Sequence, residues 1–168
     1  MKLLPRLRSL ASFSLLLLVA PLALAQESKV VLLLNLASPD SLFSTDAVEQ
    51  KRLKEAGWKQ NATARVWSTG AEDRSELHRM VRAKDGEVQR LFTGRADEIA
   101  AARAEGFVDE GVLGYVALRQ TREDLVPVYR LKNGERFLWL IDPADRAWAE
   151  KAGWTWVGED FWVLPAGK

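Results

Sequence analysis

The chain has 168 residues, with 24 Lys and Arg against 23 Asp and Glu, and it contains no cysteine. This balanced charge provides no electrostatic attraction toward nucleic acids or an anionic membrane surface. The absence of cysteine excludes a disulfide framework, a thiol nucleophile and any metal site with cysteine ligands. We therefore expect a globular domain that is held together by the burial of apolar side chains.

The first 25 residues have the pattern of a secretory signal peptide. They begin with three basic residues, continue with an apolar run over 10–20, and end in Ala23-Leu24-Ala25. Such a run is short for a membrane span, which takes about 20 residues, so cleavage is favoured over a retained N-terminal anchor. Removal of Lys2, Arg6 and Arg8 leaves 21 basic against 23 acidic residues, a net charge of −2. The sequence predicts a secreted or periplasmic protein whose mature part, residues 26–168, is one domain.

Three segments of the mature part align without a gap. They start with Leu42-Phe43, Leu91-Phe92 and Leu138-Trp139, at intervals of 49 and 47 residues. Fourteen residues after each aromatic stands a glycine followed by another aromatic, at Gly57-Trp58, Gly106-Phe107 and Gly153-Trp154. A fixed period of this size is typical of repeat architectures.

The first two units follow one order of strand, turn, strand, helix and strand. In the first unit the opening strands are predicted over 30–36 and 42–44, and the helix runs from a capping-box start at Asp46 to Gly57. In the second unit a strand contains His78, a turn lies at 84–86 and the helix ends at Gly106. Polar stretches at 69–75 and 119–124 separate the units.

The third unit shows the same order most clearly. Strands are predicted over 126–131 and 136–141, on either side of an Asn-Gly turn. Asp142 as N-cap and Pro143 at the first helical position start a helix that stops at Gly153. We predict an α+β fold of three tandem ββαβ-type repeats, the units 26–74, 75–124 and 125–168, packed as one pseudo-threefold body. A linear stack of the units is the alternative.

The third unit also resembles a known family. The segments that carry the resemblance are Val128-Tyr129-Arg130-Leu131, the stretch 153–158 and Phe161-Trp162-Val163-Leu164. They are similar to a tandem-repeat domain of unknown function, found in secreted bacterial proteins and often appended to extracellular hydrolases. The resemblance implies a binding or attachment module rather than a catalyst. The chain departs from the family where the second strand usually opens with a His, because Ser41, Arg90 and Phe137 stand there.

The acidic residues and the single histidine indicate structural roles. Three carboxylate groupings lie at predicted helix starts, where an acid caps backbone N–H groups; they are Asp46 with Glu49, Asp97 with Glu98, and Asp142 with Asp145. His78 has neither a second histidine nor a cysteine to complete a metal site. We expect no catalytic residues, no metal and no cofactor.

The seven tryptophans include the candidate ligand-binding residues. Four align with aromatic residues of the sister units and are predicted to belong to the core: Trp58, Trp139, Trp154 and Trp162. Trp67, Trp148 and Trp156 are left over, and the last two align with Arg, Ala, Gln or Asp elsewhere. They form either an exposed ligand platform or additional core packing. The packing alternative is supported by Trp148, which lies four residues from both Ala144 and Ala152, a core-face spacing.

Two arginines complete the candidate ligand-binding set, because Arg79 and Arg130 occupy aligned strand positions. Their alternative role is a structural hydrogen bond or stacking contact. The sequence favours a secreted, non-catalytic binding module with a cell-envelope or extracellular glycan as ligand. A protein-interaction module, either an inhibitor or a periplasmic assembly partner, is the competing hypothesis, since Trp is enriched at binding hot spots. A hydrolase with an unrecognised site is the third.

Overall fold

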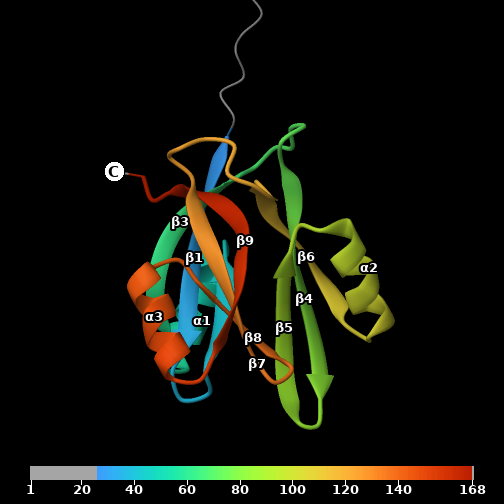
Figure 1. Cartoon of the computed structure of the whole chain (residues 1–168), viewed down its shortest axis with the longest axis vertical. Helices are drawn as coiled ribbons and strands as arrows, with labels where there is room; N and C mark the ends of the chain where they lie inside the picture. The colour runs from blue at the N-terminus through green and yellow to red at the C-terminus, as the bar shows by residue number, and fades with distance from the viewer. Residues whose placement is uncertain (1–25, 168) are drawn as a thin grey trace, which may run out of the picture.

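The computed structural model describes residues 26–167, so the predicted signal peptide at 1–25 lies outside the described residues. The first part of the chain forms β1 (Glu27–Asn35), β2 (Asp40–Ser44), α1 (Ala47–Glu55) and β3 (Lys59–Trp67). The middle part forms β4 (Ser75–Lys84), β5 (Glu87–Thr93), α2 (Ala96–Ala104) and β6 (Val108–Val116). The last part forms β7 (Val126–Asn133), β8 (Arg136–Leu140), α3 (Pro143–Lys151) and β9 (Thr155–Pro165) (Figure 1).

Side-chain caps start two of the three helices, at the predicted residues Asp46 and Asp142. The third prediction is wrong, because the N-cap of α2 is Arg95, which makes no side-chain capping hydrogen bond, and Asp97 and Glu98 lie in its first turn. Asp46 accepts a hydrogen bond from the Val48 N–H at 2.7 Å, and Asp142 accepts one from the Ala144 N–H at 2.8 Å. After α1 the chain turns at Gly57, whose φ of 91° lies in the left-handed region that glycine adopts without strain. Each helix has nine residues, which is too short for independent stability, so the helices depend on the strands beside them.

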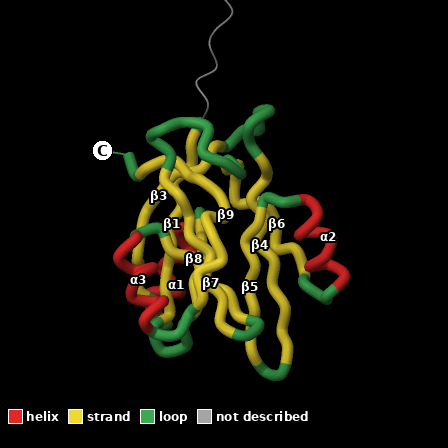
Figure 2. The backbone as a smooth tube through the Cα atoms, viewed as in Figure 1, coloured by secondary structure: helices red, strands yellow, loops and turns green. Residues whose placement is uncertain are grey.

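The strands of the described part form one antiparallel sheet. Its order is β5-β4-β6-β3-β9-β7-β8, and β1 joins it by pairing with both β3 and β2. β3 pairs with two of its neighbours over only one or two residues each, with Trp67 opposite Tyr115 of β6 and Arg65 opposite Leu164 of β9. In Figure 2 the helices lie outside the strands, with α2 on one side of the molecule and α3 on the other.

The predicted fold class is wrong. The described chain is mostly antiparallel β-structure, with nine strands in one sheet and three short helices, rather than an α+β body of three ββαβ units in pseudo-threefold packing. Cap and turn signals act over a few residues and locate single elements well. Strand pairing between distant parts of the chain, such as Trp67 with Tyr115, has no local signal, and these pairings make the sheet continuous.

The core forms around aromatic residues that align in the sequence. Phe43, Phe92 and Trp139 are fully buried, and the Phe92 ring makes edge-to-face contacts with the other two at centroid distances of 5.2 Å each. Trp58 and Trp154 are buried as well, as predicted. Trp162 is only partly buried, and it packs against a smaller second cluster that contains Trp67.

Candidate functional site: a pocket beside Trp148

The three surplus tryptophans lie in different environments. Trp67 is 2% exposed and sits in the second cluster beneath Arg74, whose guanidinium carbon lies 4.3 Å from its ring centroid. It is therefore closed to a ligand. Trp148 and Trp156 are 51% and 45% exposed.

Trp148 lines a pocket between α3 and the strands β1 and β3. The pocket has a volume of about 380 Å³. We call it the Trp148 pocket, and its lining residues are Leu34, Leu36, Lys59, Gln60, Asn61, Asp145 and Trp148. Its size lies at the small end of the range of about 300–1,000 Å³ for ligand sites.

One wall of the Trp148 pocket is polar and is built by a long-range hydrogen bond. Asn61 Nδ2 of β3 donates to Asp145 Oδ2 of α3 at 2.8 Å. Asn61 Oδ1 is buried, and nothing in residues 26–167 donates a hydrogen bond to it. An unpaired buried acceptor is unfavourable by about 1–3 kcal/mol. Because Oδ1 is closed to solvent, Asn61 contributes to this wall through its hydrogen bond to Asp145.

A β-bulge places Asn61 in this wall. In the pairing of β1 with β3, Leu32 lies opposite Ala62 and Leu33 lies opposite Gln60, so Asn61 is the extra residue of β3. A bulge re-aims a side chain and interrupts the regular alternation of the strand. Asp145 and Trp148 lie three residues apart on α3, so both face the same side of that helix.

Part of the lining is apolar. Leu36 follows β1 and is 61% exposed, while Leu34 is buried. Gln60 is already engaged, because it accepts a hydrogen bond from Lys54 at 2.7 Å and donates one to Thr63 at 3.0 Å. Lys59 makes no ion pair within the described residues. Asp145 and Lys59 remain as the groups that could meet a polar ligand.

Trp156 is not part of this pocket. The guanidinium of Arg146 lies 4.6 Å from the Trp156 ring centroid and 4.9 Å from that of Tyr129, so Arg146 packs against both rings. Residues two apart on a helix point in different directions, and Trp148 accordingly lies away from the side on which Arg146 contacts Trp156. The structure therefore separates the two tryptophans that the sequence groups together.

Arg79 is held in ion pairs rather than presented to a ligand. Its Nη1 donates to both carboxylate oxygens of Glu49 at 3.0 and 2.8 Å, and its Nε lies 2.8 Å from Glu110. Burial opposes the charge of Arg79, but the hydrogen bonds and charges of Glu49 and Glu110 outweigh it and raise its pKa. The surroundings of Arg79 therefore match its alternative role, a structural hydrogen bond, rather than ligand binding.

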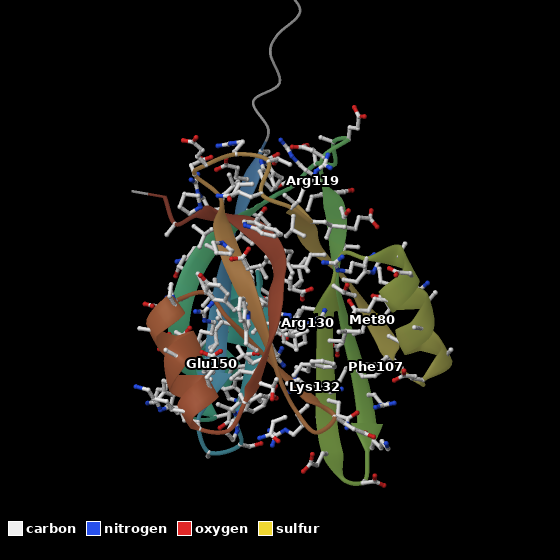
Figure 3. All side chains as sticks on the ribbon, viewed as in Figure 1. Met80, Phe107, Arg119, Arg130, Lys132 and Glu150 are labelled. Atoms are coloured by element: carbon white, nitrogen blue, oxygen red, sulfur yellow. The ribbon has the colours of Figure 1, made fainter. Side chains whose placement is uncertain are left out.

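Arg130 is engaged in the same way, deeper in the molecule. Its Nε donates to Asp160 Oδ2 at 2.8 Å, Nη1 and Nη2 donate to Glu98, and Nη2 also donates to the carbonyl of Phe92 at 3.3 Å. Figure 3 labels Arg130 in the interior of the molecule, on β7. Each of its three guanidinium nitrogens therefore has a partner within the protein.

A larger hollow of about 570 Å³ lies between α2 and the β7–β8 hairpin. Most of its charged groups pair with one another or with neighbours: Lys84 donates to Glu135 at 2.7 Å, and Glu98 accepts from Arg130. The Trp148 pocket differs because a half-exposed indole lines it. We therefore consider the Trp148 pocket the better candidate site.

Comparison with known proteins places this architecture in a family. The model of the domain of unknown function DUF5648 matches residues 29–164. The chain belongs to the DUF5648 family. The matched region includes all residues of the Trp148 pocket, and it confirms the predicted resemblance to a domain of unknown function. Searches of curated proteins and of solved structures found no match.

Sequence reasoning on this DUF5648 domain missed Asn61 as a site residue. A signal exists, because Asn61, Glu110 and Val157 each stand three residues after the aromatic of a Gly-aromatic pair. All three are the extra residues of β-bulges. Glu110 pairs with Arg79 and Val157 is exposed, so of these three bulge residues only Asn61 lines the Trp148 pocket.

The remaining polar candidates of the DUF5648 domain have structural partners. His78 Nδ1 lies 2.9 Å from Asp109 Oδ2, and Asp109 also accepts from Arg103 at 2.8 Å. Within residues 26–167 no group of three or more His, Asp or Glu side chains is arranged to hold a metal ion. No helix of the described chain is long and apolar enough to cross a membrane.

Proposed function

We propose that this DUF5648 domain is a non-catalytic carbohydrate-binding module, exported to the cell envelope or the extracellular space, and that the Trp148 pocket is its binding site. The observation that carries the proposal is a half-exposed indole beside a wall of amide and carboxylate groups. The export part rests on the signal pattern of residues 1–25.

The chemistry of the pocket suits a sugar. A pyranose ring has an apolar C–H face, which packs on an aromatic ring, and a rim of hydroxyl groups, which need hydrogen-bond partners. Trp148 offers a large apolar surface that the fold leaves half exposed. Asp145 offers acceptors and Lys59 offers donors in the same pocket.

The test is a calorimetric titration of the mature domain, residues 26–168, with a panel of soluble oligosaccharides, repeated with Trp148→Ala. We expect saturable binding of at least one sugar and its loss in Trp148→Ala, while the melting temperature stays close to wild type because the indole is half exposed. Trp156→Ala is the matched control, since it removes a similarly exposed indole outside the pocket. Equal affinity of Trp148→Ala and wild type would remove the proposed site.

A protein-interaction module remains the second candidate, favoured by one observation. Leu36 and Trp148 line the same pocket, and both are more than half exposed. Exposed apolar groups that lie together mark association surfaces, and Trp is enriched among hot-spot residues. A protein ligand whose binding is abolished by Leu36→Asp, in a domain that binds no sugar of the panel, would favour this candidate.

A further inference from the structure

We infer that the sugar recognised by the Trp148 pocket carries a protonated amino group, which makes the ligand class a cationic amino sugar. The inference rests on the proposed function and specifies its substrate. It follows from the contacts of Asp145, compared with those of the two acidic residues that align with it in the sequence.

Three aligned acidic residues lie in the first turns of the three helices of the described chain. Glu49, Glu98 and Asp145 each stand six residues after an aligned aromatic. Glu49 accepts two hydrogen bonds from Arg79, at 3.0 and 2.8 Å. Glu98 accepts two from Arg130, one of them at 3.0 Å. In both cases the two carboxylate oxygens contact a guanidinium group, so the negative charge is neutralised within the fold.

Asp145 has no such arginine. The two arginines stand where their strands pair with an aligned aromatic, and in the first part of the chain that position is Leu32 of β1. The three pairs are Arg79 with Phe92, Arg130 with Trp139, and Leu32 with Phe43. Leu32 lies opposite Ala62, the residue next to the Asn61 that contacts Asp145. A leucine carries no charge, and Asp145 makes no ion pair within residues 26–167.

One oxygen of the Asp145 carboxylate is open to a ligand. Oδ2 accepts the hydrogen bond from Asn61 Nδ2 at 2.8 Å. Oδ1 accepts no hydrogen bond from the described residues, and it is not closed to solvent. Asp145 lines the Trp148 pocket. The pocket therefore offers a carboxylate oxygen whose charge no cation of residues 26–167 neutralises.

A single free oxygen favours an ammonium group over a guanidinium group. A guanidinium binds a carboxylate best through two parallel hydrogen bonds, as Arg130 binds Glu98. At Asp145 the second oxygen is already occupied by Asn61. An ammonium is a compact charge that can donate to one acceptor, so it matches what Asp145 offers.

An amino sugar brings this ammonium together with an apolar ring face. Asp145 and Trp148 lie three residues apart on α3, which places their Cβ atoms about 5–6 Å apart on the same side of the helix. The nitrogen of a 2-amino sugar is bonded directly to the pyranose ring. A ring that packs on the half-exposed indole therefore carries its ammonium within reach of Asp145.

Lys59 is the opposing charge in this pocket. It lines the pocket and makes no ion pair in residues 26–167, so its ammonium repels a cationic ligand. Lys59 is exposed, and solvent and salt screen this repulsion, whereas the contact of an ammonium with the half-buried Asp145 is direct. Lys59→Met keeps the length of the side chain and removes its charge. It should therefore increase the preference for an amino sugar over a neutral sugar.

The experiment compares three β-1,4-linked trisaccharides that differ only at C2 of each sugar: those of glucosamine, N-acetylglucosamine and glucose. Binding to residues 26–168 is measured by calorimetry at pH 6 and low ionic strength. We expect the glucosamine trisaccharide to bind about tenfold more tightly than the other two, the gain expected from one charge-assisted hydrogen bond. The preference should shrink at high salt, because salt screens the attraction between the ammonium and the carboxylate.

Asp145→Asn tests the residue that carries the inference. It keeps the size of the side chain and an oxygen that can accept from Asn61, and it removes the charge. We expect the preference for the glucosamine trisaccharide to fall toward unity while binding of the glucose trisaccharide persists. Glu150→Gln is the matched control, because it removes one negative charge from the same helix at a residue outside the pocket (Figure 3). Its sugar preference should match wild type.

The outcomes separate the two levels of the proposal. Equal binding of the glucosamine and glucose trisaccharides, or tightest binding of the acetylated one, would overturn the amino-sugar inference and leave the carbohydrate proposal in place. An Asp145→Asn variant with the wild-type preference would also overturn it, because another group would then select the ammonium. Failure of every sugar in this set and in the wider panel would overturn the proposed function as well. Binding of a short lysine peptide in that case, lost in Asp145→Asn, would assign the pocket to a protein partner.

Discussion

Arg130 and Asp160 form an ion pair inside the protein, with Arg130 Nη2 2.8 Å from Asp160 Oδ2 and side-chain exposures of 10% and 6%. Asp160 Oδ2 also accepts the indole N–H of Trp139 at 2.8 Å. The pair thus joins β7, β8 and β9 next to the aromatic core. A buried charge is stable only while its partner is present, so this relationship predicts how the fold responds to substitution and to pH.

Replacement of Asp160 should destabilise the domain strongly. Asp160→Ala leaves Arg130 with a buried, partly uncompensated charge and removes the acceptor of the Trp139 indole, and we expect a loss of about 3–5 kcal/mol in the free energy of unfolding. Urea denaturation followed by circular dichroism measures this loss. Glu55→Ala is the control, since Lys51 and Glu55 form a surface pair that is largely solvated and should change stability little. A similar midpoint for both variants would contradict the structural role of Asp160.

Glu98 should make part of the stability depend on pH. Burial raises the pKa of the Glu98 carboxyl, but the hydrogen bonds and charge of Arg130 outweigh it, so the pKa lies below its ordinary value of 4.5. Stability from a lowered carboxyl pKa is fully present above that ordinary value and is lost as the pH falls through the folded pKa. The stability difference between wild type and Glu98→Gln should therefore shrink on acidification below about pH 4.5.

The measurement is the free energy of unfolding of both proteins from pH 7 to pH 3. Burial, and to a lesser extent the charge of Glu98, raise the pKa of Asp160, so the comparison reports on Glu98 together with its effect on Asp160. A difference that stays constant or grows toward low pH would show that Glu98 does not act through its charge.

Replacement of Phe92 should destabilise the aromatic core. It is fully buried and its ring contacts both Phe43 and Trp139. Phe92→Ala creates a cavity at the centre of this cluster, and we expect a loss of about 3–5 kcal/mol in the free energy of unfolding. Phe92→Leu, which retains most of the volume, should lose clearly less. Comparable losses would indicate that the site relaxes around the cavity.

Asn61→Leu should change stability by less than about 1 kcal/mol in either direction, because it removes both the hydrogen bond to Asp145 and the unpaired acceptor Oδ1. Thermal unfolding of the sugar-free protein measures this. A large loss would mean that the Asn61–Asp145 hydrogen bond is needed to hold α3 beside β3.

Part of this protein could be read from the sequence alone. Asp46 and Asp142 cap helices where predicted, and Trp58, Trp139 and Trp154 are buried, because caps and aromatic burial depend on a few neighbouring residues and on residue type. The resemblance to a domain of unknown function, based on motifs of the third unit, agrees with the family match over residues 29–164.

The tertiary structure determined the features that caps and aromatic residues do not predict. The pairing of Trp67 with Tyr115 joins strands into one sheet and buries Trp67. Asn61 and Asp145 are 84 residues apart, and only the packing of α3 beside β3 brings them together. Arg79 and Arg130 find carboxylates on other segments. Local sequence determines caps, turns and residue burial, whereas the sheet and the Trp148 pocket arise from contacts between distant segments, which form only when the whole chain packs.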